Sequence, residues 1–266
     1  MDLFQAFILG MIQGITEFLP ISSSGHLVLA EEFFGLETHT LKSFDVALHI
    51  ATLLAICIYF RKDVLGLIKA FFKLISGRLS RDDEYGKLIL YIVVGTIPAV
   101  LVGYFAGDLI DSIFRNVKGV AVMLALIAVV FIIGEKVHTK VPKREIGLKQ
   151  AIIIGFAQAL AIIPGVSRSG SSIVAGLFQG IERSAAARFS FLLGIPAMVG
   201  AALLTTLSSD GEFAVEAMPM IVGFVSAFAF GIASVAGLMH FLKKHTLVSF
   251  AVYRLALVLI IVLNFL

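Results

Sequence analysis

Charged residues are scarce in this chain of 266 residues. They make up 15% of it and apolar residues 59%, whereas a soluble domain usually has about 25% charged and 45–50% apolar residues. A single cysteine excludes a scaffold of disulfides within the chain, and the many Leu, Ile, Val and Phe residues exclude disorder. The formal net charge of +3 gives no indication of nucleic acid as a partner. We therefore expect an integral membrane protein.

The beginning of the chain lacks the features of a cleavable signal. Residues 1–19 contain Asp2, have no basic n-region and are not followed by a small-residue cleavage site. We therefore expect this segment to be part of the mature fold.

Apolar runs of about 20 residues, the length of a transmembrane helix, occur six times. They cover residues 43–60, 86–106, 117–135, 186–208, 217–241 and 247–265. Two more stretches, 3–35 and 148–181, are each interrupted halfway by a Ser/Gly/Pro cluster, and irregular backbone at membrane depth must be buried in protein or line a cavity. We expect an all-α polytopic membrane protein with six transmembrane helices and two re-entrant helical hairpins. The alternative for each interrupted stretch is a single broken span.

Basic residues are concentrated in a few connections. They gather in residues 61–87 and 136–149 and at Lys243-Lys244, whereas acidic residues dominate 107–116 and 209–216. The positive-inside rule makes the first group cytoplasmic and the second external. Six crossings then place both termini outside, with the first hairpin entering from outside and the second from the cytoplasm. Arg254, a few residues inside the last run, is expected to snorkel to the cytoplasmic surface.

The two interrupted stretches align with each other, without a gap, at a spacing of 145 residues. The aligned pairs include Gln13 with Gln158, Ser22 with Ser167, Ser24 with Ser169 and Gly25 with Gly170. Three spans separate the copies, so the repeat halves of this single domain, about 3–136 and 148–266, are predicted to have inverted topology. In such proteins the substrate site forms at the repeat interface from discontinuous helices. We expect the two hairpin tips to meet inside the membrane.

Three ionisable residues, Glu17, His26 and Arg168, lie beside these tips. Such a group costs about 2.5–3.5 kcal/mol at the bilayer centre on insertion scales, so each is expected to have a partner or a function. A Glu17–Arg168 ion pair and a helix-capping His26 are the structural alternatives. Helix N-termini at the tips would form an anion site, and Arg168 would add a planar fork suited to phosphate.

Serine hydroxyls at the tips are further donors for a phosphate. The candidates are Ser22, Ser23, Ser24, Ser167, Ser169 and Ser172, and each is an equally good candidate for a helix cap. So many donors require several acceptor oxygens, which favours phosphate over carboxylate. Glu17 would repel a bound phosphate unless it is protonated, holds a metal or acts as a general base, so it indicates chemistry on the phosphate.

Other known sites are absent from the sequence. It contains no G-x-x-x-x-G-K-[ST] loop and no H-E-x-x-H motif. His49 and His240 have no second ligand at metal spacing and are expected to be packed or interfacial. Cys57 is expected to be a small buried hydrophobe.

The tip motifs resemble those of a known family, the undecaprenyl-diphosphate phosphatases (bacitracin-resistance proteins) of bacteria. The first motif is Gln13-x-x-x-Glu17-x-x-Pro20-x-Ser22-Ser23-Ser24-Gly25-His26, and the second is Pro164-Gly165-x-Ser167-Arg168-Ser169-Gly170. The chain length and a Tyr253-Arg254 pair in the last run also agree. The resemblance implies hydrolysis of undecaprenyl diphosphate to undecaprenyl phosphate in the bacterial cell membrane, recycling the lipid carrier of cell-wall synthesis, at a site open to the external side.

The resemblance also implies residue roles. Glu17, Ser23, His26 and Arg168 would be catalytic, and Gln13, Ser22, Ser24, Gly25, Ser167, Ser169, Gly170 and Ser172 would line the phosphate site. The nucleophile stays open between Ser23, His26 and a water. No covalent cofactor is expected. Whether the site uses a divalent cation, Mg²⁺ or Ca²⁺, stays open, and Glu17 would be its ligand. Gln13 stands where some family members have a second carboxylate.

Two related functions compete with this one. The phosphatidic-acid phosphatase superfamily is excluded, because the chain has no Arg-Pro pair, and Val174 and Phe178 stand where its His and Asp would fall. A transporter or flippase of a polyprenyl phosphate lipid is the alternative function, because inverted repeats with broken helices are typical of transporters. The pattern leaves open whether the protein forms a homodimer.

Overall fold

The computed structural model describes residues 1–36, 41–80, 82–208 and 215–265, and all regular structure in these ranges is helical. The helices are α1 Leu3–Phe18, α2 Ser23–Phe33, α3 Lys42–Tyr59, α4 Arg61–Ile75, α5 Glu84–Phe114, α6 Val117–His138, α7 Leu148–Leu160, α8 Arg168–Phe178, α9 Arg183–Ser208, α10 Ala217–Phe241 and α11 Val248–Phe265. The all-α prediction is confirmed.

The predicted spans correspond to six of these helices. Helices α5, α6, α9 and α10 are long and apolar enough to cross a membrane, while α3 and α11 are shorter. The polytopic membrane protein expected from the sequence is therefore confirmed.

The basic connection 61–87 is not a simple loop, contrary to expectation, because residues 61–75 form α4. This helix leaves α3 at an angle of 86°. Its exposed side chains are both apolar, as at Leu65 and Phe72, and basic, as at Lys69. Such a helix is typical of the membrane interface.

Each interrupted stretch forms a helix, a turn and a second helix. Helices α2 and α8 begin at residues 23 and 168, again 145 apart. Their N-caps, Ser22 and Ser167, have φ angles of 75° and 77° and are the only non-glycine residues with positive φ among those described. Each cap Oγ accepts a hydrogen bond from the amide three residues later, at Gly25 (3.3 Å) or Gly170 (3.2 Å). Both hairpins therefore turn with the same uncommon backbone conformation.

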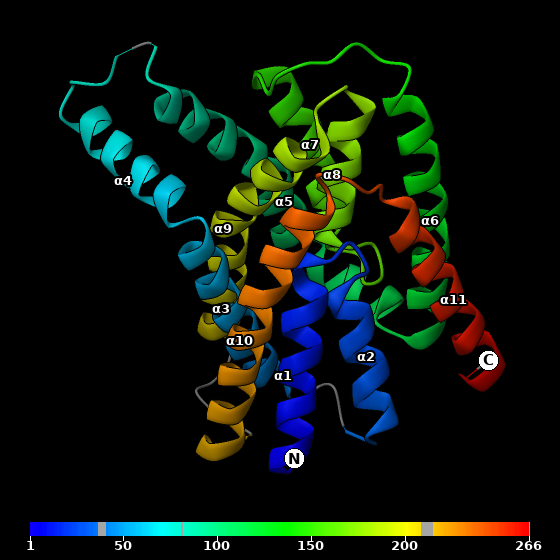
Figure 1. Ribbon diagram of the computed structural model, residues 1–266. Coiled ribbons are helices and arrows are strands. Elements are labelled where there is room, and N and C mark those ends of the chain that lie inside the picture. The colour runs from blue at the N-terminus through cyan, green and yellow to red at the C-terminus, as the bar shows by residue number, and fades with distance from the viewer. Residues whose placement is uncertain (37–40, 81, 209–214, 266) are drawn as a thin grey trace.

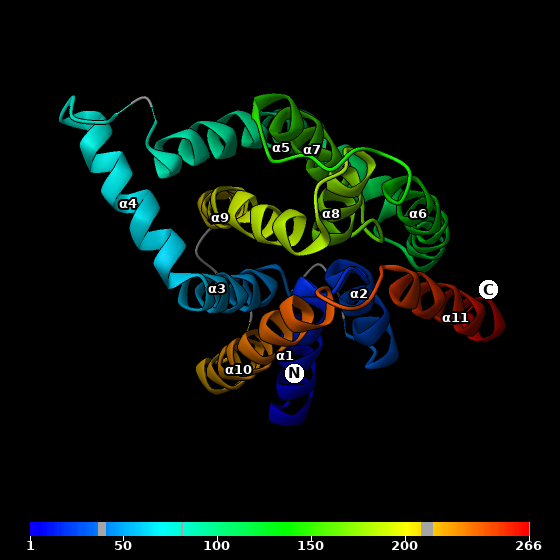
Figure 2. The same cartoon turned by 45° about the horizontal axis from the view of Figure 1, so that its top comes forward.

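The hairpins enter the protein from opposite ends. In Figure 1, α1 and α2 extend from the end that holds both termini, whereas α7 and α8 extend from the end that holds α4 and the basic connections. Helix α1 packs along α10, and α7 along α5. Figure 2 shows these two pairs on either side of α3 and α9.

Glycines allow the hairpins to pack closely against their neighbours. A Cβ added at Gly10 of α1 would lie 2.3 Å from the carbonyl oxygen of Gly223 in α10. At Gly155 of α7, 145 residues later, it would lie 2.3 Å from that of Gly95 in α5. Small residues permit such close approach of helix backbones in membranes, and here they hold the first arm of each hairpin in place.

Candidate active site

The two hairpin tips are in direct contact, as the repeat predicts. Ser169 Oγ, on the second tip, donates to the carbonyl oxygen of Leu19 on the first at 3.2 Å. Arg168 Nη2 donates to Glu17 Oε1 at 3.0 Å. The candidate residues of two segments about 150 positions apart in the sequence thus form one cluster.

Arg254 of α11 does not snorkel to the surface, so that prediction is wrong. Its side chain is fully buried. The guanidinium donates to carbonyl oxygens of the first tip at Pro20 (3.2 Å), of the second tip at Val166 (3.3 Å) and of α6 at Leu124 (3.2 Å). It also lies over the ring of Phe131 in α6, 5.4 Å from its centroid. The position of an arginine within an apolar run does not determine whether its side chain faces lipid or protein. Here the side chain of Arg254 links the two hairpin tips.

Replacing Arg254 with methionine is expected to lower the thermal unfolding midpoint, because the carbonyl oxygens of Pro20 and Val166 would lose their donor. A buried polar group without a partner costs about 1–3 kcal/mol. Thermal unfolding of the purified protein in detergent measures this, with the exposed Arg61→Met as the control. An unchanged midpoint in Arg254→Met would contradict this role.

Glu17 is the centre of the site. It lies at the end of α1, is 7% exposed and binds residues from both hairpins. Its Oε2 accepts hydrogen bonds from Ser23 Oγ at 2.7 Å and Gln13 Nε2 at 3.1 Å, while Oε1 accepts from Arg168. A hydroxyl hydrogen-bonded to a carboxylate is the arrangement of a nucleophile with its general base.

Arg168 fits the site because the neighbouring α9 leaves space for it. Besides Glu17, the guanidinium approaches the carbonyl oxygen of Ser190 at 3.5 Å through Nη1. A Cβ added at Gly194 would lie 1.5 Å from that same nitrogen. Glycine at 194 is therefore required for the position of the guanidinium beside Glu17.

Both ring nitrogens of His26 have a hydrogen-bond partner, which fixes the orientation of the ring. Its Nδ1 lies 2.7 Å from the carbonyl oxygen of Ser22, and its Nε2 lies 2.8 Å from the hydroxyl of Tyr253 in α11. Since a carbonyl only accepts, Nδ1 carries the proton, and in the neutral ring Nε2 accepts from Tyr253. The two rings are stacked, with their centroids 5.8 Å apart. The lone pair of Nε2 is thus held at the edge of the site.

The predicted phosphate-binding serines have different contacts. Ser22 and Ser167 are N-caps. The hydroxyl of Ser22 is therefore paired with the amide of Gly25, and that of Ser167 with the amide of Gly170. Ser169 binds the other tip, and Ser172 donates to the carbonyl oxygen of Arg168 at 2.8 Å within its own helix. Ser24 Oγ lies 3.3 Å from Ser22 Oγ. Ser23 is the serine that contacts Glu17.

Two residues near the site were not among the predicted site residues. His49 of α3, expected to be packed or interfacial, has its Nε2 3.8 Å from Glu17 Oε2, and its Nδ1 lies 2.8 Å from the carbonyl oxygen of Asp45. Tyr253 binds His26. In the repeat register His49 aligns with Gly194, the residue that makes room for Arg168, but this relation becomes visible only in the structure.

The charges around the tips favour an anion. Glu17 and Arg168 balance each other as an ion pair. The partners recorded for Arg254 in the described part of the chain are carbonyl oxygens and an aromatic ring, which do not neutralise its charge. The first amides of α2 and α8 add the positive ends of two helix dipoles. The tips therefore have an excess of positive charge.

The protein ligands at the tips do not form a complete site for a divalent cation by themselves, and a cation held by Glu17 would take its other ligands from phosphate or water. The described residues contain no group of three or more His, Cys, Asp or Glu side chains placed to hold a metal. Both oxygens of Glu17 already accept hydrogen bonds, and Gln13 offers an amide where a second carboxylate would stand.

Comparisons with known proteins agree over nearly the whole chain. A family model described as "Bacitracin resistance protein BacA" matches residues 6–260. Similar proteins named undecaprenyl-diphosphatase include those of Rubrobacter xylanophilus (41% identical, 97% of this chain and 96% of the relative), Thermomicrobium roseum (40%, 99% and 98%) and Geotalea daltonii (42%, 97% and 96%). The matches include both hairpins and most of α11.

Proposed function

We infer that this chain, which belongs to the bacitracin resistance protein BacA family, hydrolyses undecaprenyl diphosphate to undecaprenyl phosphate and inorganic phosphate. The relatives that match it over nearly their full length are undecaprenyl-diphosphatases. The observation that carries the chemistry is the hydrogen bond from Ser23 to Glu17, beside Arg168 and at the contact of the two hairpin tips.

The diphosphate is proposed to bind between the tips. The Arg168 guanidinium and the first amides of α2 and α8 contact the terminal phosphate, and the buried charge of Arg254 contributes at longer range. Gln13 orients Glu17 through its 3.1 Å hydrogen bond. A fixed set of donors of this kind stabilises charge on the equatorial oxygens in the transition state.

Ser23 is the proposed nucleophile. Its Oγ attacks the terminal phosphorus, and Glu17 accepts the hydroxyl proton. The bond from phosphorus to the bridging oxygen breaks, and undecaprenyl phosphate leaves with the electron pair. Glu17 passes its proton to the departing undecaprenyl phosphate and is again a carboxylate. Water then attacks the phosphoserine and loses a proton to Glu17. The bond from phosphorus to Ser23 Oγ breaks, and the proton passes from Glu17 to Oγ as inorganic phosphate leaves. His26 Nε2 is the competing nucleophile, because an imidazole nitrogen can also form a covalent intermediate.

The site is proposed to open on the external side of the cell membrane. The basic connections gather at one end of the protein and both termini at the other (Figure 1), so the positive-inside rule assigns the end with the termini to the outside. The two halves are proposed to be inverted repeats, supported by the shared 145-residue spacing of their caps and close-packed glycines.

A carrier of the same lipid is the weaker alternative, because transport does not require a serine held against a carboxylate. The purified protein in detergent micelles, where transport is not scored, is expected to release inorganic phosphate from undecaprenyl diphosphate. A protein that releases none in micelles but moves the lipid across vesicle membranes would contradict the enzymatic function and support the carrier.

A further inference from the structure

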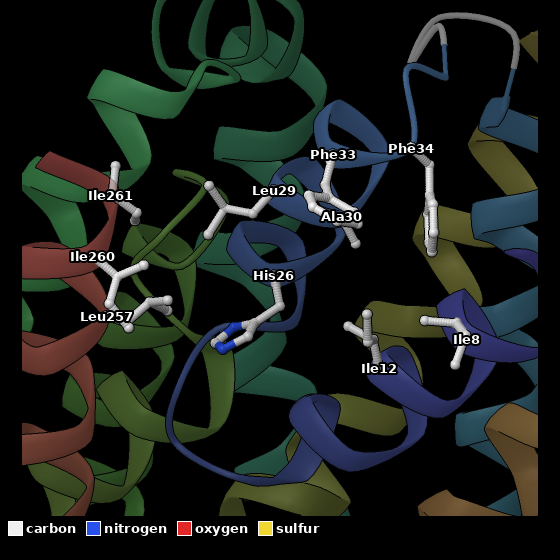
Figure 3. A pocket seen from close by; sticks show the side chains of 10 residues that line it. All are labelled: Ile8, Ile12, His26, Leu29, Ala30, Phe33, Phe34, Leu257, Ile260 and Ile261. Atoms are coloured by element: carbon white, nitrogen blue, oxygen red, sulfur yellow. The ribbon is translucent and has the colours of Figure 1, made fainter. Parts of the chain in front are cut away.

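Helix α2 carries a buried carboxyl group that the proposed mechanism does not use. Figure 3 shows one side of this helix, where Leu29, Ala30 and Phe33 border an apolar surface. Phe33 is 77% exposed, whereas Glu31 is 0% exposed. The side chain of Glu31 is therefore enclosed by protein, and an ionised carboxylate in such a place needs a partner.

The neighbour of Glu31 at hydrogen-bonding distance is a second carboxyl group, that of Asp45 in α3. Asp45 is buried as well. Among the described residues, no donor reaches either carboxyl oxygen of Glu31 or Oδ1 of Asp45. Two ionised carboxylates only accept hydrogen bonds, so they would meet here with no hydrogen between them. A proton on one of them turns that group into a donor for the other.

The charges around the two carboxyl groups also favour a single negative charge. Arg115, in the turn between α5 and α6, donates through Nη2 to Asp45 Oδ2 at 3.0 Å. His49 is the other charged or titratable group recorded beside Asp45 in the described part of the chain. Since Asp45 already has Arg115 as its counter-charge, an ionised Glu31 would add a second, repelling carboxylate. Carboxylates that share a buried site hold one proton between them for this reason.

This carboxyl pair joins two helices that carry groups of the reaction site. Helix α2 packs against α1 and α6 and begins with Ser23, whose hydroxyl binds Glu17. Helix α3 places His49 Nε2 3.8 Å from the same carboxylate. Glu31 lies eight residues after Ser23, about 12 Å along the helix, and its contact with Asp45 links α2 to α3. The link limits how far α2 can shift.

We propose that Glu31 and Asp45 share one proton and that this pair positions Ser23 against Glu17. The positioning role rests on the proposed function, whereas the shared proton does not. Glu31 is a positioning residue because it acts on the reaction through α2. A glutamine at this position can still donate to Asp45, so Glu31→Gln keeps the link. Glu31→Ala breaks the link but leaves the ion pair of Asp45 with Arg115, so this variant is expected to fold.

Infrared difference spectroscopy of the purified protein tests the shared proton, because a protonated carboxyl group has a C=O stretch that a carboxylate lacks. At neutral pH this band is expected in the wild type and absent from Glu31→Gln. It is also expected to be absent from Asp45→Asn, where Glu31 ionises beside Arg115. The control is Glu32→Gln, which changes the exposed carboxylate next in the chain and should keep the band.

Two infrared results would overturn the shared proton. A wild type without the band would show that both groups are ionised or that a cation lies between them. A band that disappears in Glu31→Gln but persists in Asp45→Asn would show that Glu31 holds its proton alone.

Phosphate release from undecaprenyl diphosphate tests the positioning role. Glu31→Ala is expected to lower kcat about 10²-fold, since small misplacements of reacting atoms are costly in rate. Glu31→Gln and Glu32→Gln are expected to keep the wild-type kcat. Wild-type kcat in Glu31→Ala, an equal loss in Glu31→Gln, or a Glu31→Ala protein that does not fold would overturn positioning. A wild type that releases no phosphate overturns the proposed function and the positioning role together, while the infrared band still decides the shared proton.

Discussion

Arg168→Lys is expected to lower kcat about 10²–10³-fold, the loss typical when a transition-state donor is removed, while the protein stays folded. Arg168 binds Glu17 with one nitrogen and approaches the carbonyl oxygen of Ser190 with another. A planar fork can keep the carboxylate and still contact a phosphate, whereas an ammonium is a point charge that serves one of them at a time. Phosphate release and the thermal unfolding midpoint, measured on the same sample, test this.

Arg168→Ala separates the phosphate role from the ion pair. This variant leaves Glu17 buried without a counter-charge, and breaking a buried pair in this way costs about 3–5 kcal/mol. We therefore expect a lower unfolding midpoint for Arg168→Ala but not for Arg168→Lys. Wild-type turnover in Arg168→Lys would refute the contact with phosphate. Equal destabilisation of both variants would indicate that the ion pair is the sole role of the arginine.

Glu17→Gln is expected to have a second large effect, a fall in kcat of about 10²–10⁴-fold, the range for loss of a general base. The amide keeps the size of the carboxylate and a hydrogen bond to Ser23, but it accepts no proton. It also removes a negative charge from beside the bound phosphate. We therefore expect KM to fall together with kcat, a combination that a merely structural carboxylate would not produce.

The matched control for this variant is Glu182→Gln, which changes an exposed carboxylate between α8 and α9. It is expected to leave both kinetic constants unchanged. If Glu17→Gln retains the wild-type kcat, Glu17 is not the base. If its KM rises instead of falling, the carboxylate contributes to binding rather than opposing it.

The hairpins and the contact of their tips follow from the sequence because the signals are local. Gly and Ser clusters end apolar runs that are too short to span, and the same cluster at a spacing of 145 residues indicates that the two belong together. Glu17 and Arg168 stand out because ionisable groups are costly in an apolar segment. Their ion pair is one of the alternatives that this cost predicts.

The partners of Arg254 and His49 could not be predicted in the same way. Each lies in an apolar helix, and the pattern around it does not show which neighbour its side chain faces. The serines had a similar ambiguity, since a hydroxyl serves equally as a cap and as a ligand donor. The structure makes caps of Ser22 and Ser167 and pairs Ser23 with Glu17. The basic residues of 61–87 indicate a side of the membrane, but their charge gives no sign that residues 61–75 form helix α4.

The most direct test of the central claim is to trap the phosphorylated enzyme and locate the phosphate. Undecaprenyl diphosphate labelled with ³²P in its terminal phosphate is mixed with the purified protein, quenched within the first turnover and digested for mass spectrometry. Since acid destroys phosphohistidine but not phosphoserine, samples are quenched in both acid and alkali. We predict label on Ser23, stable in acid and absent from Ser23→Ala. Label on His26, or full turnover in Ser23→Ala, would contradict the assignment of Ser23 as the nucleophile.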